Sequence, residues 1–396
     1  MLKRILFLNC LIYFFSCCHP TGKENIYVGN TINVSEPLNI PIEKFIESYD
    51  TIRIETSDRS LLSGVQQARM MNDKLYIADR TGAFVFIYSL DGKYLSKICN
   101  QGQGPNEYLR IAKFEVDPIN NRLFVTDAFS RKLFEYDEYG NLRTITKLDF
   151  FPLHFASDKS SRFIHLNSGP RMYDLQKKNM NFPHNVSIVN REGSIIQSFL
   201  EDETPDRIDI TYSVAPSYTK KGELLYMPVL SDIIYRISED QAIPEYLLIS
   251  DCKNILGSKE KEDIFYTFES NNVADYEKDG YLISFGSFLK SDSLMTFSFG
   301  LENKWRTFYS LQNKKSFTIR PNSMSGNKGL CEIFSNFPQF VEGNTFYIAV
   351  EPDQISYALP LLPEGKLKTF FESFTEDDNP CIIAYRINKK LFDVEK

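Results

Sequence analysis

Short runs of β-branched and aromatic residues recur from residue 27 to the end of the chain, and turn-forming residues separate them. Such runs are typical of short β-strands joined by tight turns. No linker rich in Pro, Gly or Ser interrupts the pattern, and no heptad repeat is present. The sequence therefore predicts one continuous all-β domain after the N-terminus.

The clearest internal repeat is a pair of copies that lie 48 positions apart. In each copy a predicted strand ends in an aspartate, Asp79 or Asp127, whose carboxylate can bond the backbone of the next turn. A second strand follows, and then Gly92 or Gly140 supplies the positive φ of a tight hairpin. A period in the forties is typical of one four-stranded propeller blade. Because the two aspartates recur with the repeat, we interpret them as turn formers rather than as a catalytic pair.

Later copies are more degenerate but keep the alternation of strand and turn. Residues 49–55 are also β-like and precede the first full blade, so we expect them to pair with the C-terminal strands and close a ring. Residues 259–266 and 364–374 are predicted to be helical or loop insertions. The sequence predicts hairpins over 186–200 and 224–237, a meander over 281–319, and final strands at 346–350 and 381–387.

The N-terminus has the pattern of an export signal. Lys3 and Arg4 precede an apolar stretch of 11 residues, 5–15, which is too short to cross a bilayer as a helix. Ser16 stands directly before Cys17, as in the lipobox of bacterial lipoproteins, so Cys17 is the expected site of lipid attachment and Cys18 the alternative. A plain cleaved signal is the second interpretation and a retained transmembrane anchor the third.

These features divide the chain into three parts. Residues 1–17 are predicted to be the signal peptide with its lipobox, 18–40 a tether, and 41–396 the propeller domain.

Composition narrows the choice of partners. The net charge of −7 disfavours nucleic acid and an anionic membrane surface as the main partner, since both need a basic face. The chain has 32 Phe and 22 Tyr but a single Trp, Trp305. We interpret the rings mainly as filling between sheets, and sugar-binding platforms are the alternative.

Four cysteines follow the N-terminal segment, and they lie far apart in the sequence. Their spacing fits no zinc motif. In an exported protein they could form disulfides in three pairings, but four small buried side chains are the simpler interpretation. They are Cys99, Cys252, Cys331 and Cys381.

Three stretches resemble a known family, the six-bladed β-propeller lipoproteins of Bacteroidetes, which are distantly related to NHL-like and TolB-like propellers. Residues 100–108 resemble the family's G-x-G-P-x-E-Y segment between the first two blades. Residues 230–237 are similar to its S-D-x-I-Y-x-I strand, and residues 378–387 to its closing strand. The resemblance implies six blades, export and membrane anchoring, often beside glycan-uptake systems, and it supplies no catalytic residues.

The sequence contains none of the common catalytic motifs, such as H-E-x-x-H, G-x-S-x-G or a Walker loop. His154 and His165 could meet across neighbouring strands, but no carboxylate or cysteine lies at a spacing from them that is typical of a metal site. We interpret these two and His184 as isolated or surface histidines, and we expect no metal and no cofactor.

The loop over residues 101–108 is the strongest candidate for a binding surface. Gln103, Asn106, Glu107 and Tyr108 offer polar and aromatic contacts on a path that two glycines and a proline constrain. The favoured alternative is a blade-to-blade connection that bonds to its own neighbours.

These observations favour a membrane-anchored binding or scaffold protein of the cell envelope, expected at the outer membrane. Its partner would be an envelope protein or a glycan, and it would touch the membrane through the N-terminal lipid alone. The rival hypothesis is a carbohydrate-active hydrolase or lyase that uses carboxylates at the propeller channel. A sensor that relays an envelope signal is a third possibility. Acidic or histidine side chains clustered inside the ring would favour the enzyme.

Overall fold

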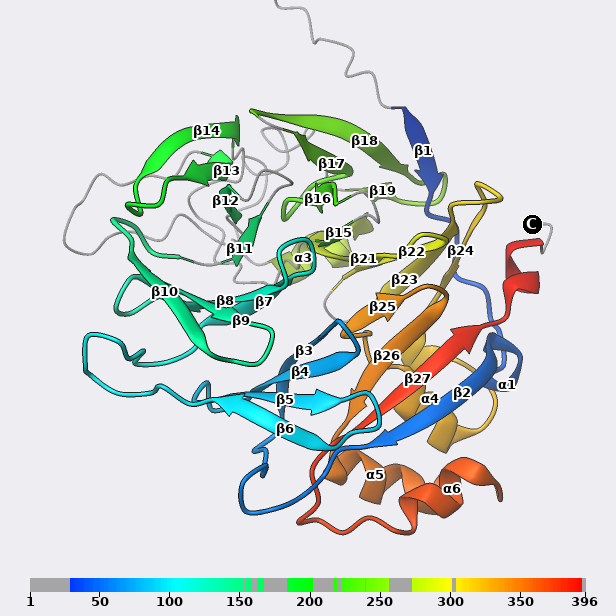
Figure 1. Ribbon diagram of the computed structural model, residues 1–396. Coiled ribbons are helices and arrows are strands. Elements are labelled where there is room, and N and C mark those ends of the chain that lie inside the picture. Colours follow the sequence, from blue (N-terminus) through cyan, green and yellow to red (C-terminus); the bar gives the residue numbers. More distant parts are fainter. Residues whose placement is uncertain are drawn as a thin grey trace, which may run out of the picture.

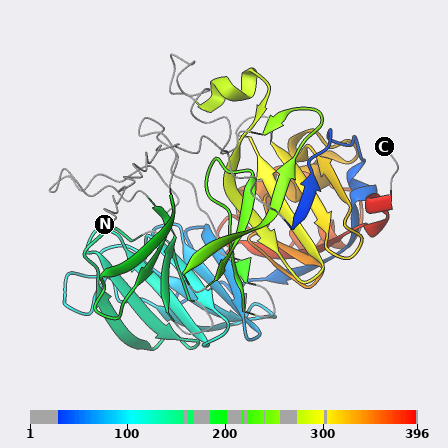
Figure 2. The same cartoon turned by 90° about the horizontal axis from the view of Figure 1, so that it is seen from above.

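The structure, a computed structural model, shows a six-bladed β-propeller, as predicted. Six antiparallel sheets radiate around a common centre (Figure 1). Figure 2 shows the ring from a direction at right angles to that view. The structure describes residues 29–152, 154–157, 162–166, 184–201, 217–218, 222–238, 240–255, 273–300 and 304–393.

The first three blades are meanders of four strands, and the chain runs from the innermost to the outermost strand of each. Blade I contains β3 (Val65–Met71), β4 (Lys74–Asp79), β5 (Val85–Ser89) and β6 (Tyr94–Ile98). Blade II contains β7 (Lys113–Asp117), β8 (Arg122–Asp127), β9 (Lys132–Asp137) and β10 (Leu142–Lys147). Blade III contains β11 (His154–Ser157), β12 (Phe163–Leu166), β13 (His184–Val189) and β14 (Ile195–Glu201).

The other three blades complete the ring. Blade IV contains β15 (Ser217–Tyr218), β16 (Leu224–Tyr226), β17 (Ile233–Ser238) and β18 (Gln241–Ile249). Blade V contains β21 (Ser284–Lys290), β22 (Leu294–Phe299), β23 (Trp305–Ser310) and β24 (Ser316–Ile319). Blade VI contains β25 (Phe340–Glu342), β26 (Thr345–Val350), β27 (Cys381–Ile387) and β2 (Ile46–Arg53). The innermost strands contact one another between blades I and II, II and III, IV and V, V and VI, and VI and I, so they line the middle of the ring.

Two expectations about the irregular elements are adjusted by the structure. The meander predicted from residue 281 begins instead at Ser284, because β20 (Tyr281–Leu282) pairs in parallel with β19 (Asn254–Ile255) outside blade V. The insertion at 364–374 contains the helix α6 (Lys366–Phe371), whereas that at 259–266 lies outside the described residues. The sequence pattern predicts none of the following helices: α1 (Ile42–Phe45), α3 (Val273–Lys278), α4 (Lys328–Phe334), α5 (Pro352–Ala358), η1 (Pro321–Ser323), η2 (Leu359–Leu361) and η3 (Lys389–Asp393).

The ring closes through strands from opposite ends of the chain, as predicted. β2 is the outermost strand of blade VI and pairs antiparallel with β27, with Tyr49 opposite Tyr385. Asn379, just before β27, is fully buried and bonds the loop that leads from β2 into blade I. Its Nδ2 donates to the carbonyl oxygens of Glu55 and Ser60, at 2.8 and 2.7 Å, and its Oδ1 accepts the N–H of Leu62 at 2.8 Å.

The predicted tether boundary at residue 40 is wrong, because residues 30–41 pack on the outside of the ring. We call this segment the N-terminal strap. Its strand β1 (Asn30–Asn33) pairs in parallel with β18 as a fifth strand of blade IV. Ile32 and Val34 are completely buried beneath it, and the N–H of Leu38 donates to Thr318 of blade V at 2.8 Å. This alternation of apolar residues supplies the burial that a free tether lacks.

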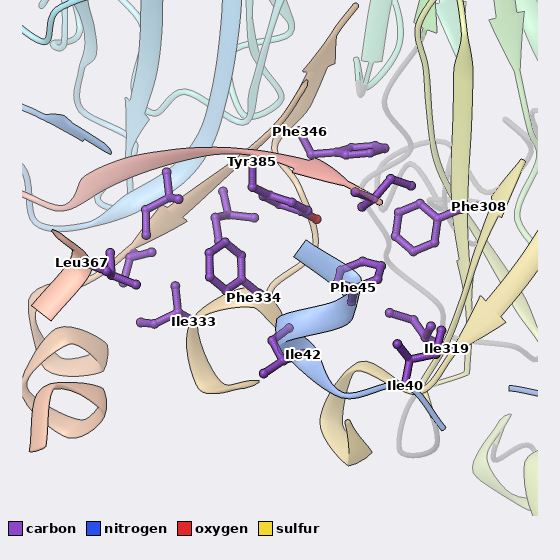
Figure 3. Close-up of a cluster of buried hydrophobic side chains, with 14 of the residues drawn as sticks. Ile40, Ile42, Phe45, Phe308, Ile319, Ile333, Phe334, Phe346, Leu367 and Tyr385 are labelled. Carbon is purple, nitrogen blue, oxygen red and sulfur yellow. The ribbon is translucent and has the colours of Figure 1, made fainter. Parts of the chain in front are cut away.

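A large apolar cluster, which includes Ile40 of the strap, joins the strap to blades V and VI. Figure 3 shows Phe45 of α1 and Phe334 of α4 beside Tyr385 of β27, with ring centroids 6.5 and 5.3 Å from that of Tyr385. Phe45 also lies 5.5 Å from Phe308 of blade V. The helices outside blade VI therefore cover the seam where the ring closes.

In each of blades I, II and III, the hairpin between the third and fourth strands contains a glycine, and this glycine lies close to the preceding blade. In the turn between the third and fourth strands of blade I, Gly92 has φ 84°, and a Cβ there would stand 2.0 Å from the carbonyl oxygen of Arg53 in blade VI. Gly193 in blade III has φ 90° and would bring a Cβ to 1.9 Å from the carbonyl oxygen of Lys147 in blade II. Gly140 has the same place in blade II with φ 85°. The repeated glycine thus serves both the turn and the close approach of blades.

We expect Gly92→Ala and Gly193→Ala to lower the free energy of unfolding by about 3 kcal/mol or more, because left-handed strain of about 1–2 kcal/mol adds to a backbone overlap. Gly343→Ala is the matched control, since Gly343 has φ 54° and open space around it, and we expect it to lose only about 1 kcal/mol. Urea unfolding measures the three values. Equal losses of unfolding free energy in all three variants would contradict a role of Gly92 and Gly193 in the close packing of blades.

We expect Asn379→Ala to lower the free energy of unfolding by about 2–3 kcal/mol, because the buried N–H of Leu62 loses its acceptor. Asn106→Ala, which removes an exposed amide, should stay within about 0.5 kcal/mol of the wild type. Thermal or urea unfolding separates the two. A wild-type transition for Asn379→Ala would show that the closing loop does not depend on this side chain.

Candidate functional site

Five polar side chains from the innermost strands of blades I–III meet inside the ring, and we call them the inner polar cluster. Residues two apart on a strand share a face, so each of β3 and β7 contributes two of them. Glu115 is the centre: Arg69 donates to both of its carboxylate oxygens, at 3.1 and 3.3 Å, and Gln67 donates at 3.1 Å. The cluster consists of Gln67 and Arg69 of β3, Lys113 and Glu115 of β7, and His154 of β11.

Burial sets the charges in the inner polar cluster. Glu115 is 3% exposed; this burial would raise the pKa of its carboxyl, but Arg69 and His154 outweigh it and hold the pKa below its usual value. His154 has no exposed surface, and burial lowers its pKa by more than Glu115 raises it. Burial also lowers the pKa of Lys113. At neutral pH the cluster therefore holds an ionised Glu115 beside a neutral His154.

This arrangement suits a structural role better than acid–base chemistry. A general acid for glycoside cleavage needs a carboxyl with a raised pKa and access to substrate. Glu115 has a lowered pKa, and both of its oxygens are already occupied. Arg69 also donates to the carbonyl oxygen of Gln339, just before β25, at 3.0 Å. The inner polar cluster therefore links the inner strands of four successive blades.

The expectation of isolated or surface histidines is wrong for two of the three. The Nδ1 of His154 lies 3.5 Å from the Oε1 of Glu115. The two residues are 39 positions apart in the sequence, and they meet because blade III stacks on blade II. His165 is buried against the rings of Phe150 and Phe155, with centroids 4.8 and 5.4 Å away. Burial and the nearby His154 lower the pKa of His165 to about 3. His184 is half-buried on β13.

A second polar network joins blades II and III. Arg122 bridges Asp117 and Glu135, with both distances 2.7 Å, and all three side chains are buried. Blade III adds the Ser157 hydroxyl, which donates to Asp117, and Arg191, which contacts Glu135 at 2.8 Å. The charges inside this part of the ring are thus paired across the seam between blades.

The predicted binding loop is largely occupied with its own structure. Tyr108 is fully buried, and its hydroxyl donates to the carbonyl oxygen of Ala83 in blade I at 2.7 Å. Glu107 accepts the N–H of Gly104 at 2.7 Å. Gln103 and Asn106 are exposed. Two of the four residues therefore hold the loop in place, and two remain available to a ligand.

The repeated aspartates bond backbone N–H groups. Asp79 accepts the N–H of Ser63 at 2.7 Å and that of Thr81 at 3.0 Å. Asp127 accepts the N–H of Leu109 at 2.7 Å and that of Phe129 at 3.0 Å. Each carboxylate thus ties a hairpin turn to the segment that enters its blade, which agrees with a turn-forming role.

The four cysteines of the ring are free thiols, but only Cys381 is the buried side chain expected of all four. Cys331 is half-buried, and Cys99 and Cys252 are exposed. Cys17 and Cys18 lie outside the described residues. Within the residues that the structure describes, no three His, Cys, Asp or Glu side chains gather closely enough to hold a metal ion.

A family model described as "Domain of unknown function (DUF4934)" matches residues 24–386. The chain belongs to this family. The match runs from before β1 into β27, so it includes all six blades. No curated protein matches this DUF4934 chain significantly.

Two solved structures show the same architecture as this DUF4934 chain. A "Putative exported protein" from Bacteroides fragilis has a TM-score of 0.74 at 15% identity, over 91% of this chain and 100% of that chain. A member of the DUF4221 family from Bacteroides vulgatus has a TM-score of 0.50 at 12% identity, over 87% of this chain and 97% of that chain. At such identities the similarity establishes the fold.

No helix among the residues described for this DUF4934 chain has the length and apolar character that a membrane crossing requires.

We expect Glu115→Gln to lower the free energy of unfolding at pH 7 by about 3 kcal/mol, because Arg69 becomes a buried charge without its counter-ion. The lowered pKa of Glu115 means that its contribution is present above about pH 4.3, the usual value for Glu, and fades as pH falls through the folded value. The loss should therefore shrink at pH 3.5. Urea unfolding at both pH values, with the exposed Glu192→Gln as control, tests this. An equal loss at both would contradict it.

Proposed function

We propose that the protein is an exported binding or scaffold protein, anchored in the envelope through a lipid on Cys17 and located at the outer membrane. The observation that carries this proposal is the engagement of the inner polar cluster in links between blades, with Glu115 occupied on both oxygens. Because the polar side chains inside the ring bond one blade to the next, the outer surface is the part of the ring that is free to bind a partner. The relaxed lipobox at Ser16–Cys17 and the Bacteroides structures of the same fold support export and anchoring.

The surface beside the 101–108 loop suits a protein partner. Leu109 is 43% exposed and Phe129 is 67% exposed, and both backbones bond to the same Asp127 carboxylate, so the two residues are neighbours in space. Exposed Gln103 and Asn106 lie on the same loop as Leu109. Apolar anchors with a polar border are the usual composition of a protein interface. We name Gln103, Asn106, Leu109 and Phe129 the loop surface.

The rigidity of the loop surface also supports binding. Lys132 of β9 donates to the carbonyl oxygens of Pro105 and Glu107, at 3.1 and 3.0 Å, so the loop is fixed to blade II. A surface that is already ordered loses little conformational entropy when it binds. The carbohydrate-active alternative has Glu115 and His154 inside the ring in its favour, but the lowered pKa of Glu115 and its two occupied oxygens count against it.

The test is an affinity purification of the full-length, membrane-anchored protein from its native envelope, followed by mass spectrometry. We expect a stoichiometric partner that survives 0.5 M salt, and we expect Leu109→Ser with Phe129→Ser to reduce its recovery at least tenfold. Tyr357→Ser is the matched control, because Tyr357 is 63% exposed on α5, in blade VI. Undiminished recovery with the double variant would reject the loop surface, and no partner at all would reject the scaffold function.

A further inference from the structure

We propose that the rim of blades IV and V, along which the N-terminal strap runs, faces the lipid surface that carries the anchor. The inference rests on the proposed lipidation of Cys17. It adds an orientation, because it leaves blades I and II, with the loop surface, directed away from the membrane.

The place where the chain joins the ring is fixed. β1 begins at Asn30 and lies on the outer edge of blade IV, beside β18 (Figure 1). Val34 donates its N–H to the carbonyl oxygen of Ile249 at 2.7 Å, and its side chain is completely buried. The strap therefore holds this point of the rim firmly against the blade.

The chain between the lipid and the strap limits how far the rim can be from the membrane. Thirteen peptide steps separate Cys17 from Asn30. A fully extended chain of this length spans at most about 45 Å. A compact domain of this size has a radius of gyration of about 21 Å, so its diameter is about 50 Å. Residues beside β1 therefore cannot lie farther than about 45 Å from the lipid, whereas residues across the ring are not limited to that distance.

Three cations lie beside the strap although the whole chain carries −7, and we call Lys253, Lys315 and Arg320 the basic border. Lys315 precedes Ser316, whose hydroxyl donates to the carbonyl oxygen of Asn33 in the strap. Lys253 follows Cys252, whose Sγ lies 3.8 Å from the carbonyl oxygen of Val34. Arg320 follows Ile319, which bridges Leu38 of the strap, and Lys253, Lys315 and Arg320 are all at least partly exposed. Lys315 also pairs with Asp393 at 3.2 Å.

Two of these cations are held in place by the single tryptophan. The Lys253 ammonium lies 5.5 Å and the Arg320 guanidinium 5.7 Å from the ring centroid of Trp305, which is itself buried. Cations fixed at the rim, next to the point where the anchored segment joins the ring, complement the phosphates of lipid headgroups. Tether and charge therefore favour the same side of the ring.

The native thiols offer a direct test. Cys252 borders the strap, whereas Cys99 follows β6 in blade I, and both are exposed. Full-length lipidated protein in which Cys18→Ser and Cys331→Ser are combined with either Cys99→Ser or Cys252→Ser keeps one accessible thiol, which is labelled with a donor dye. It is then reconstituted in phosphatidylcholine vesicles that contain one-fifth phosphatidylglycerol and an acceptor-labelled lipid. We expect energy transfer from Cys252 to exceed that from Cys99 at least twofold, and equal or reversed transfer would overturn the orientation.

Charge variants test the basic border. Lys253→Glu, Lys315→Glu and Arg320→Glu together should reduce the difference between the two thiols by at least half. The matched triple on blades I and II is Arg59→Glu, Lys93→Glu and Arg143→Glu, which removes exposed cations away from the strap and should leave the difference unchanged. A difference that persists in the first triple would overturn the role of the basic border.

Failure of the anchor and failure of the orientation give different results. Metabolic labelling with a fatty-acid analogue should mark the wild type and not Cys17→Ala. An unlabelled wild type that washes off membranes would reject the anchor, and with it the proposed function. A labelled protein with stronger transfer from Cys99 would reject the orientation alone.

Discussion

The whole structure depends on one pairing, that of β2 with β27. Each blade of a propeller stacks only on its neighbours. The ring therefore needs a bond between its first and last parts before every blade has a neighbour on both sides. Here the strand pairing supplies that bond, and Asn379 and the apolar cluster around Tyr385 reinforce it from inside and outside. The polar groups in the middle of the ring then serve the same end, since Arg69 and Glu115 join adjacent inner strands.

Much of the architecture could be read from the sequence, because its signals are local. The shift of 48 between Asp79 and Asp127 located two blades, and the β-like segment at 49–55 predicted the closure. The innermost strands β3 and β7 gave no such signal. They carry polar residues, such as Arg69 and Glu115, at positions where a strand that faces a core usually has apolar residues. The bonding partner of each of these two side chains lies in a neighbouring blade.

The candidate site was less predictable for the same reason. His154 and Glu115 are 39 positions apart, and only the stacking of blade III on blade II brings them together. The loop motif at 101–108 was visible in the sequence, but sequence alone could not say that Tyr108 points inward and Gln103 outward. The strap resembles a tether in sequence because the four residues of β1 are too few to produce a convincing strand pattern. The His154–Glu115 contact, the directions of the loop side chains and the packing of the strap all depend on contacts between segments that are distant in the sequence.

The closing pair also constrains when the molecule can fold. Arg53 is opposite Cys381, so the pairing joins residues 328 positions apart. Contacts this far apart in sequence form late and slowly, because the entropy of closing so long a loop must be overcome first. A chain exported N-terminus first would therefore hold β2 without its partner until nearly all of the protein had crossed the membrane. During that interval the unpaired edge of β2 is open to other strands, so the late arrival of β27 exposes the chain to wrong strand pairing.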